Sequence, residues 1–94
     1  MKKDEILIFL KDNKEYIQKK YEVDKIALFG SFARDEATKN SDIDILVDMK
    51  SSFDNFFDLK YFLENRFKIK VDLAKEKTLR LFIKNKIQKD LIYV

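Results

Sequence analysis

"LFGSFARDEATKNSDIDILVD" (residues 28–48) decides the fold, because it joins two predicted strands through a bend. The apolar run 23–30 ends at Gly30, the only glycine in the chain, and is typical of a buried strand stopped by a turn residue. After a short helix over 31–37 and a loop over 39–41, residues 42–48 begin with alternating polar and apolar positions, which predicts a second strand. The stretch therefore predicts two strands linked by a sharp bend at Gly30.

The remaining periodicity predicts helices and one further strand. Helical spacing of apolar residues extends over 4–20 and 51–67, and the basic segment 77–90 places four of them on one side: Leu79, Phe82, Ile83 and Ile87. Residues 68–74 alternate and predict a third strand, while 91–94 form either a short edge strand or an apolar tail. We expect an α/β (α+β) fold, a small mixed β-sheet flanked by helices, in a single domain of residues 1–94. Ser51 or Ser52 is the expected cap of the helix over 51–67.

The composition excludes several kinds of chemistry. The 94 residues contain neither cysteine nor histidine, which excludes disulfides, thiolate zinc sites and histidine acid–base catalysis. No apolar run approaches the roughly 18 residues of a membrane span. The first residues do not resemble a secretory signal, so we expect a cytoplasmic protein without membrane contact. A net charge of +3 is weak support for nucleic-acid binding, and we do not expect direct contact with nucleic acid.

Asp42 and Asp44 carry the main functional hypothesis. Residues i and i+2 of a strand point to the same face, so both carboxylates would project from one side of the sheet. Two adjacent carboxylates repel each other unless a cation lies between them. Mg²⁺ commonly takes one or two carboxylates and keeps phosphate and water at its other positions. Taken alone, an Asp-x-Asp pair is more often solvated surface than a metal site.

Gly30, Ser31 and Asp72 extend this hypothesis. A glycine lets the backbone approach a ligand closely, and a helix that begins at Ser31 offers free N–H groups to a phosphate. Asp72 lies between Val71 and Leu73 in the third predicted strand, where an acid is costly unless it is paired or bound to a metal. If that strand lies beside the second, the three aspartates can hold two magnesium ions, and Asp72 is the expected general base. The sequence thus predicts a site for a magnesium–triphosphate.

These residues resemble the minimal nucleotidyltransferase family, within the polymerase-beta-like nucleotidyltransferase superfamily. The family pattern is a Gly-Ser pair, a spacer of about ten residues, an Asp-x-Asp and a third acid on a later strand. The chain matches it from about residue 20 to the end, including Arg34 of the GSxAR form and Ser41. The resemblance implies metal-binding and catalytic roles for Asp42, Asp44 and Asp72, and nucleotide-binding roles for Gly30, Ser31, Arg34 and Ser41.

The resemblance also implies an activity, which is transfer of AMP from ATP to an acceptor with release of pyrophosphate. Minimal members are commonly antitoxins encoded beside a HEPN-family RNase toxin, and the expected acceptor is a tyrosine hydroxyl of that toxin. Because a chain this short leaves no residues for an acceptor-binding domain, we expect the partner protein to position its own acceptor. One alternative is an antitoxin that blocks its toxin by binding alone. Another is a small nucleic-acid binder that uses the Lys-rich helix.

Three points stay open at this stage. Many relatives have a glycine where this chain has Asp35, and we expect Asp35 to end the short helix in the left-handed conformation. Arg34 either holds a phosphate oxygen or pairs with Asp35 or Glu36. The candidate docking surfaces are aromatic residues of 51–67 that are not needed in the core, the C-terminal residues 91–94 and the basic stretch 75–89.

Overall fold

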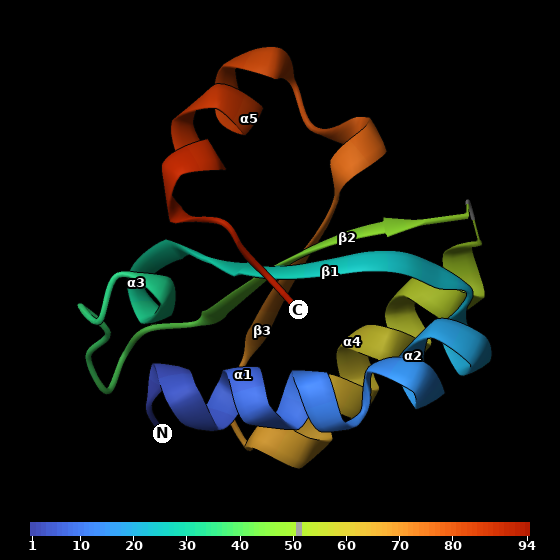
Figure 1. Cartoon of the computed structure of the whole chain (residues 1–94), viewed down its shortest axis with the longest axis horizontal. Helices are drawn as coiled ribbons and strands as arrows, with labels where there is room; N and C mark the ends of the chain where they lie inside the picture. The colour runs from blue at the N-terminus through green and yellow to red at the C-terminus, as the bar shows by residue number, and fades with distance from the viewer. Residues whose placement is uncertain (51) are drawn as a thin grey trace.

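The computed structural model describes residues 1–50 and 52–94 (Figure 1). Its elements follow in the order α1 (Lys3–Asp12), α2 (Lys14–Tyr21), β1 (Val23–Phe29), α3 (Gly30–Ala33), β2 (Ile43–Met49), α4 (Phe53–Phe67), β3 (Val71–Lys75), the 3-10 turn η1 (Glu76–Thr78), α5 (Leu81–Ile87), the 3-10 turn η2 (Gln88–Asp90) and β4 (Ile92–Tyr93).

The strands form one mixed sheet in the order β3-β2-β1-β4. β2 and β3 are parallel, whereas β1 is antiparallel to both of its neighbours, β2 and β4. Of the two alternatives for residues 91–94, the short edge strand is therefore present. The predicted mixed sheet flanked by helices is confirmed.

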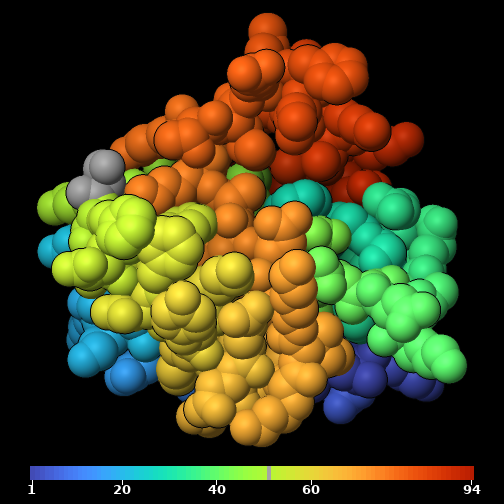
Figure 2. Space-filling model, turned by 180° about the vertical axis from the view of Figure 1, so that it is seen from behind, coloured from blue at the N-terminus to red at the C-terminus, as the bar shows by residue number. Residues whose placement is uncertain are grey.

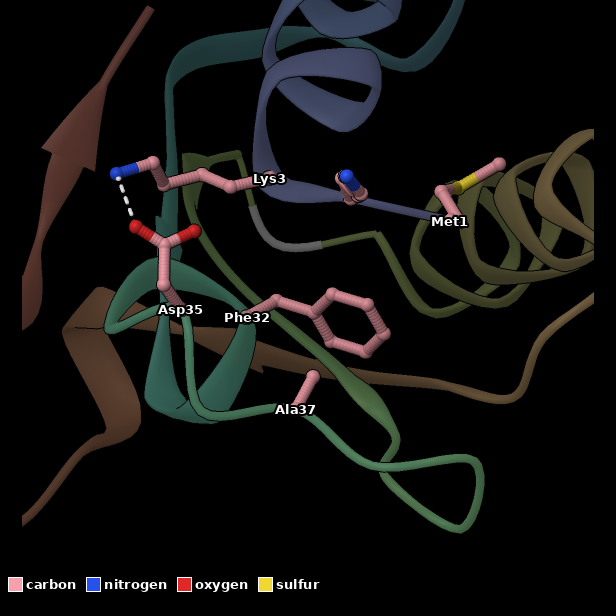
Figure 3. A pocket seen from close by; sticks show the side chains of 6 residues that line it. Met1, Lys3, Phe32, Asp35 and Ala37 are labelled. Atoms are coloured by element: carbon pink, nitrogen blue, oxygen red, sulfur yellow. Dashed lines mark hydrogen bonds and ion pairs between the residues drawn. The ribbon is translucent and has the colours of Figure 1, made fainter.

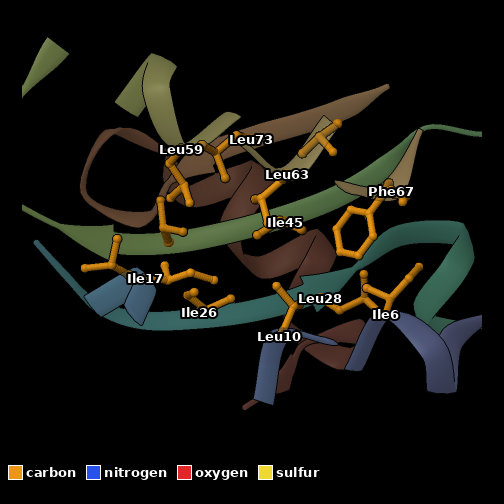
Figure 4. Packing of buried hydrophobic residues seen from close by; sticks show 14 of the residues in the cluster. Ile6, Leu10, Ile17, Ile26, Leu28, Ile45, Leu59, Leu63, Phe67 and Leu73 are labelled. Carbon is orange, nitrogen blue, oxygen red and sulfur yellow. The ribbon is translucent and has the colours of Figure 1, made fainter. Parts of the chain in front are cut away.

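The two faces of the sheet are covered differently (Figure 1). Helices α1, α2 and α4 lie on one face, and α5 with its flanking turns lies over the other. Figure 4 shows the apolar core on the first face, where strand residues such as Ile26 and Ile45 pack against Leu10, Ile17 and Leu63. The alternation of β2 directs Ile43, Ile45 and Val47 into this core, so Asp44, Leu46 and Asp48 face the other way.

The predicted helix over 4–20 is two helices, which corrects the sequence-based expectation. Asn13 interrupts it with φ −104° and ψ 8°. Its side-chain Nδ2 donates to the carbonyl of Phe9 at 2.9 Å, and its own carbonyl accepts from Ile17 at 2.9 Å. Asn13 thus ends α1 and begins α2, because an Asn side chain competes for backbone acceptors within a helix. The buried residues remain those at helical spacing, Ile6, Leu10, Ile17 and Tyr21.

The helix over 51–67 begins at Phe53 with Ser52 as its cap. The hydroxyl of Ser52 accepts a hydrogen bond from the N–H of Asn55 at 3.2 Å, which satisfies one of the free donors of the first turn. The other proposed cap, Ser51, lies outside the described residues. Leu59, Leu63 and Phe67 are the buried residues of α4.

Residues 77–90 do not form the single helix predicted from their spacing. The hydroxyl of Thr78 donates to the carbonyl of Lys75 at 3.2 Å and helps close η1, and the extended residues Leu79 and Arg80 precede the seven-residue helix α5. The predicted apolar side does not pack as a unit, because Phe82 is 75% exposed. Helix α5 has no buried residue and covers the sheet loosely. None of the helices in residues 1–50 and 52–94 has the length and apolar character needed to span a bilayer.

Candidate active site

Two of the three predicted acids lie side by side on neighbouring strands. The parallel register of β2 and β3 pairs Asp44 directly with Asp72. Residues paired in this way point to the same face, so both carboxylates lie on the face opposite the apolar core. Asp42 lies just before β2, and its charge acts on Asp44. The structure therefore brings Asp44 and Asp72 together, with Asp42 close enough for its charge to act on Asp44.

The environment of Asp44 disfavours its charged form. Burial, the charge of Asp72 and the charge of Asp42, in that order, raise the pKa of the Asp44 carboxyl from 3.8 to about 6. A hydrogen bond with Asp72 adds to the shift, and the positive charge of Arg34 opposes it. A divalent cation beside Asp44 and Asp72 would reverse this balance, because an adjacent positive charge favours ionised carboxylates.

Gly30 is required by the approach of β1 to Asp44. Its φ of +76° lies in the left-handed region, where a residue with a side chain is strained. A Cβ at this position would overlap Oδ2 of Asp44 and would lie 2.9 Å from its Cγ. The antiparallel register explains this closeness, because it pairs Asp44 with Phe29, the residue before the glycine. The only glycine therefore makes room for a carboxylate as well as for a bend.

Ser31 and Ser41 occupy different positions relative to this pair. Ser31 follows Gly30 in α3 and is partly exposed. Ser41 organises the loop before Asp42, because its hydroxyl accepts from the N–H of Thr38 at 2.9 Å and its own N–H donates to the carbonyl of Thr38 at 3.0 Å. Ser31 thus lies beside the glycine bend, whereas Ser41 shapes the loop that leads to Asp42.

Arg34 is held by two carboxylates. Its Nη1 donates to Oδ2 of Asp90 at 2.7 Å, and its Nε donates to Oε1 of Glu36 at 3.1 Å. The hydrogen bond with Asp90 is the main reason why the pKa of Arg34 is raised. The pairing with Glu36, one of the open alternatives, is present. The sequence did not predict the role of Asp90, because its contact with Arg34 joins residues 56 positions apart and no local pattern indicates it.

Asp35 adopts the left-handed conformation that we expected at this position, with φ +58°. Its carboxylate pairs with Lys3 of α1 at 3.0 Å and not with Arg34 (Figure 3). The hollow in Figure 3 lies between α3 and the start of α1, and its lining includes Met1, Phe32 and Ala37. None of the three aspartates lines this hollow, so the carboxylate face of the sheet remains the candidate active site.

The donor set fits a magnesium ion that shares its coordination with a ligand. In the described part of the chain, no group of three acidic side chains converges closely enough to hold a metal ion unaided. Asp44 and Asp72 nevertheless offer hard oxygen donors from one face of adjacent strands. Magnesium usually takes one or two carboxylates and fills its other positions with water and phosphate. The arrangement fits this mode of binding better than a complete protein cage.

A mixed sheet that pairs two carboxylates beside a glycine bend is the arrangement expected of a nucleotidyl-transferring enzyme. The family described as "Nucleotidyltransferase domain" matches residues 10–94. The chain belongs to this family and is a nucleotidyltransferase.

Two relatives illustrate the similarity in sequence. The chain is 44% identical over 93 residues to "Putative protein adenylyltransferase MJ0128" of Methanocaldococcus jannaschii, covering 96% of this chain and 95% of that protein. It is 33% identical over 93 residues to the protein adenylyltransferase MntA of Thermococcus cleftensis, covering 97% of this chain and 94% of that protein.

Two solved structures illustrate the similarity in fold. A structure described as a "putative minimal nucleotidyltransferase" matches with a TM-score of 0.76 and 25% sequence identity, and the match covers 98% of this chain and 95% of that one. A chain from a crystal structure of a toxin–antitoxin with AMP-PNP has a TM-score of 0.70 and 22% identity, covering 99% of this chain and 72% of that one. The expected minimal nucleotidyltransferase fold is therefore confirmed.

Proposed function

We propose that this nucleotidyltransferase is a magnesium-dependent antitoxin that transfers AMP from ATP to a tyrosine hydroxyl of a cognate HEPN-family RNase toxin. The observation that carries the proposal is the direct pairing of Asp44 with Asp72 on the face opposite the core, beside Gly30. The names of the relatives support a protein as acceptor, and the solved toxin–antitoxin with AMP-PNP supports a toxin partner and an adenine nucleotide.

The three aspartates, the glycine bend and Arg34 have separate roles in this reaction. Asp42, Asp44 and Asp72 would hold magnesium, which neutralises phosphate charge when it is bound. The bend at Gly30 and Ser31 receives phosphate oxygens, and Arg34 supplies a positive charge near Asp44. The tyrosine oxygen attacks the α-phosphorus of ATP, the bond from that phosphorus to the bridging oxygen breaks, and pyrophosphate leaves. The carboxylate of Asp72 accepts the tyrosine proton.

Intact mass spectrometry of the toxin tests this function directly. After incubation of the toxin with the protein, ATP and Mg²⁺, we expect a gain of whole AMP units on the toxin. Asp42→Ala should reduce the rate by more than about 100-fold, because a metal-site residue is lost. Asp24→Asn, at an exposed position of β1, is the matched control and should leave the rate unchanged. Unmodified toxin that is nevertheless neutralised would replace this proposal with inhibition by binding alone.

The docking surface for the toxin is assigned to α5. Leu81 and Phe82 are 72% and 75% exposed, and Figure 2 shows this segment as a ridge above the body of the molecule. It belongs to the stretch that covers the carboxylate face. Residues 75–89 carry six cations and the single acid Glu76, so the partner surface should be apolar with an acidic rim. The exposed Phe53 of α4 and Tyr93 of β4 are the competing surfaces.

A kinetic comparison separates these surfaces. Replacing Leu81 and Phe82 together by serine should raise the KM for the toxin and leave ATP binding unchanged, because exposed apolar anchors contribute to docking and not to the nucleotide site. Phe53→Ser, at a position equally exposed on α4, is the control. A larger effect of Phe53→Ser would move the docking surface to α4.

A further inference from the structure

Asp90 is a carboxylate with no role in the family pattern, yet it makes the shortest contact of Arg34. The Oδ2 of Asp90 accepts from Nη1 of Arg34 at 2.7 Å, whereas Glu36 contacts Nε at 3.1 Å. The Asp90 side chain is only 10% exposed, compared with 43% for Arg34. A largely buried carboxylate is destabilising without a partner, so this pair is more than a fluctuating surface contact.

The sheet explains how a residue near the end of the chain reaches α3. Strand β4 pairs Tyr93 with Ala27 and Ile92 with Leu28. Continued by two residues, this antiparallel register brings residue 90 level with residue 30, where β1 bends into α3. Because β1 also pairs Phe29 with Asp44 across its other edge, and Asp44 pairs with Asp72, Asp90 lies one residue away from the level of the sheet that carries the two aspartates.

We propose that Asp90 is a positioning residue that fixes the guanidinium of Arg34 so that it can receive a phosphate oxygen of the nucleotide. This proposal rests on the proposed function. The contacts with Asp90 and Glu36 use Nη1 and Nε, and within the described residues no carboxylate or carbonyl contacts the third nitrogen, Nη2. Arg34 lies close enough to Asp44 for its charge to act on that carboxylate. A guanidinium held on two nitrogens has a defined direction for its remaining donors.

The proposal predicts that Asp90→Asn changes nucleotide affinity in the direction opposite to that expected from charge repulsion alone. Asp90→Asn removes a negative charge near the triphosphate, and loss of that repulsion alone would strengthen nucleotide binding. If Asp90 positions Arg34, the same substitution weakens nucleotide binding, because the freed guanidinium adopts many conformations and must be reordered by the ligand.

Calorimetric titration with the ATP analogue AMP-PNP in the presence of Mg²⁺ measures this difference. We expect Asp90→Asn to raise the dissociation constant about three- to tenfold, as for the loss of one charge-assisted contact. Asp90→Glu keeps the carboxylate and should restore part of the affinity. Arg34→Gln should weaken binding at least as much as Asp90→Asn, and the double variant should bind no more weakly than Arg34→Gln. Glu15→Gln breaks the exposed Lys19–Glu15 pair and serves as the control.

The outcomes are distinguishable. Unchanged or tighter binding by Asp90→Asn, with wild-type affinity that depends on Asp42, overturns the positioning role and leaves the proposed function intact. Additive effects of Arg34→Gln and Asp90→Asn overturn it as well. If the wild-type protein binds no nucleotide, the proposed function fails and this inference fails with it. If Asp90→Asn does not fold, as shown by thermal unfolding, Arg34→Gln carries the test, and wild-type affinity in that variant overturns the role, because the guanidinium that Asp90 holds would then make no contact with the nucleotide.

Discussion

The two faces of the sheet differ in how they are covered, although the same strands build both. On the α1/α2/α4 face, apolar side chains are fully buried, as in Ile45 and Leu63. On the α5 face, Asp44 and Asp72 meet beneath a segment whose helix has no buried residue. That segment is tied down by β4 and by ion pairs, which include Lys77 with Asp48 at 3.7 Å and Arg34 with Asp90 at 2.7 Å.

This difference shows how a small chain separates stability from chemistry. Because side chains alternate along a strand, one residue of β2 can stabilise the core while the next carries charge on the other face. Burial of apolar area on the first face stabilises the fold. The second face holds carboxylates that repel each other and would be costly inside a packed core. Substitutions on the two faces should therefore affect different properties.

The largest effect on stability is expected for Leu63→Ala. Leu63 is fully buried between α4 and the sheet, so its loss should lower the free energy of unfolding by about 2–5 kcal/mol through lost burial and a cavity. Leu81→Ala removes the same atoms from a residue that is 72% exposed on α5 and should change stability by less than about 0.5 kcal/mol. Urea titration of both variants measures the contrast. Similar losses would mean that α5 is as firmly packed as α4.

Gly30→Ala should have the next largest effect on stability, and it acts at the bend beside Asp44. The left-handed φ and the contact with Asp44 together should cost about 1–3 kcal/mol. In an Asp44→Ala background the carboxylate is absent, so the part of this cost that arises from the contact should disappear while the backbone strain remains. A double-mutant cycle in urea measures the difference. Strictly additive costs would show that the glycine serves only the bend.

The features predicted from the sequence were those that depend on local pattern. The alternation of residues 42–48 and the glycine at the end of a strand each involve only a few adjacent positions. The structure contains both the strand and the bend that they predict. The break at Asn13 depends on one side chain competing for a backbone carbonyl within an otherwise helical pattern. The Arg34–Asp90 contact depends on the register of β1 and β4, which no local pattern specifies. The predicted length of the last helix was wrong, because the helical spacing of apolar residues continues through the 3-10 turn η1 and the extended residues before α5.

The smallest effect expected is a pH dependence that arises on the carboxylate face. The pKa of Asp44 is raised from 3.8 to about 6 in the folded protein, so the folded state binds its proton more tightly than the unfolded state. The contribution of this group to stability is therefore fully present below about pH 3.8 and is lost as the pH rises through 6. In the presence of a chelator, Asp44→Asn should be more stable than the wild type at pH 7, on the order of 1 kcal/mol, and the two should converge at low pH.

Thermal unfolding across this pH range, with Asp24→Asn as the exposed control, measures the difference between the two curves. Magnesium should reverse the order at pH 7, because a cation that binds only the folded wild type stabilises it by mass action. Parallel curves for wild type and Asp44→Asn would mean that the carboxylates do not interact as their register requires. A gain in stability with magnesium that persists in Asp44→Asn would place the cation elsewhere on the molecule. A face that serves chemistry should therefore show two properties together. Its carboxylate destabilises the free protein, and the stabilisation by magnesium depends on that carboxylate, whereas a face that serves packing should show neither.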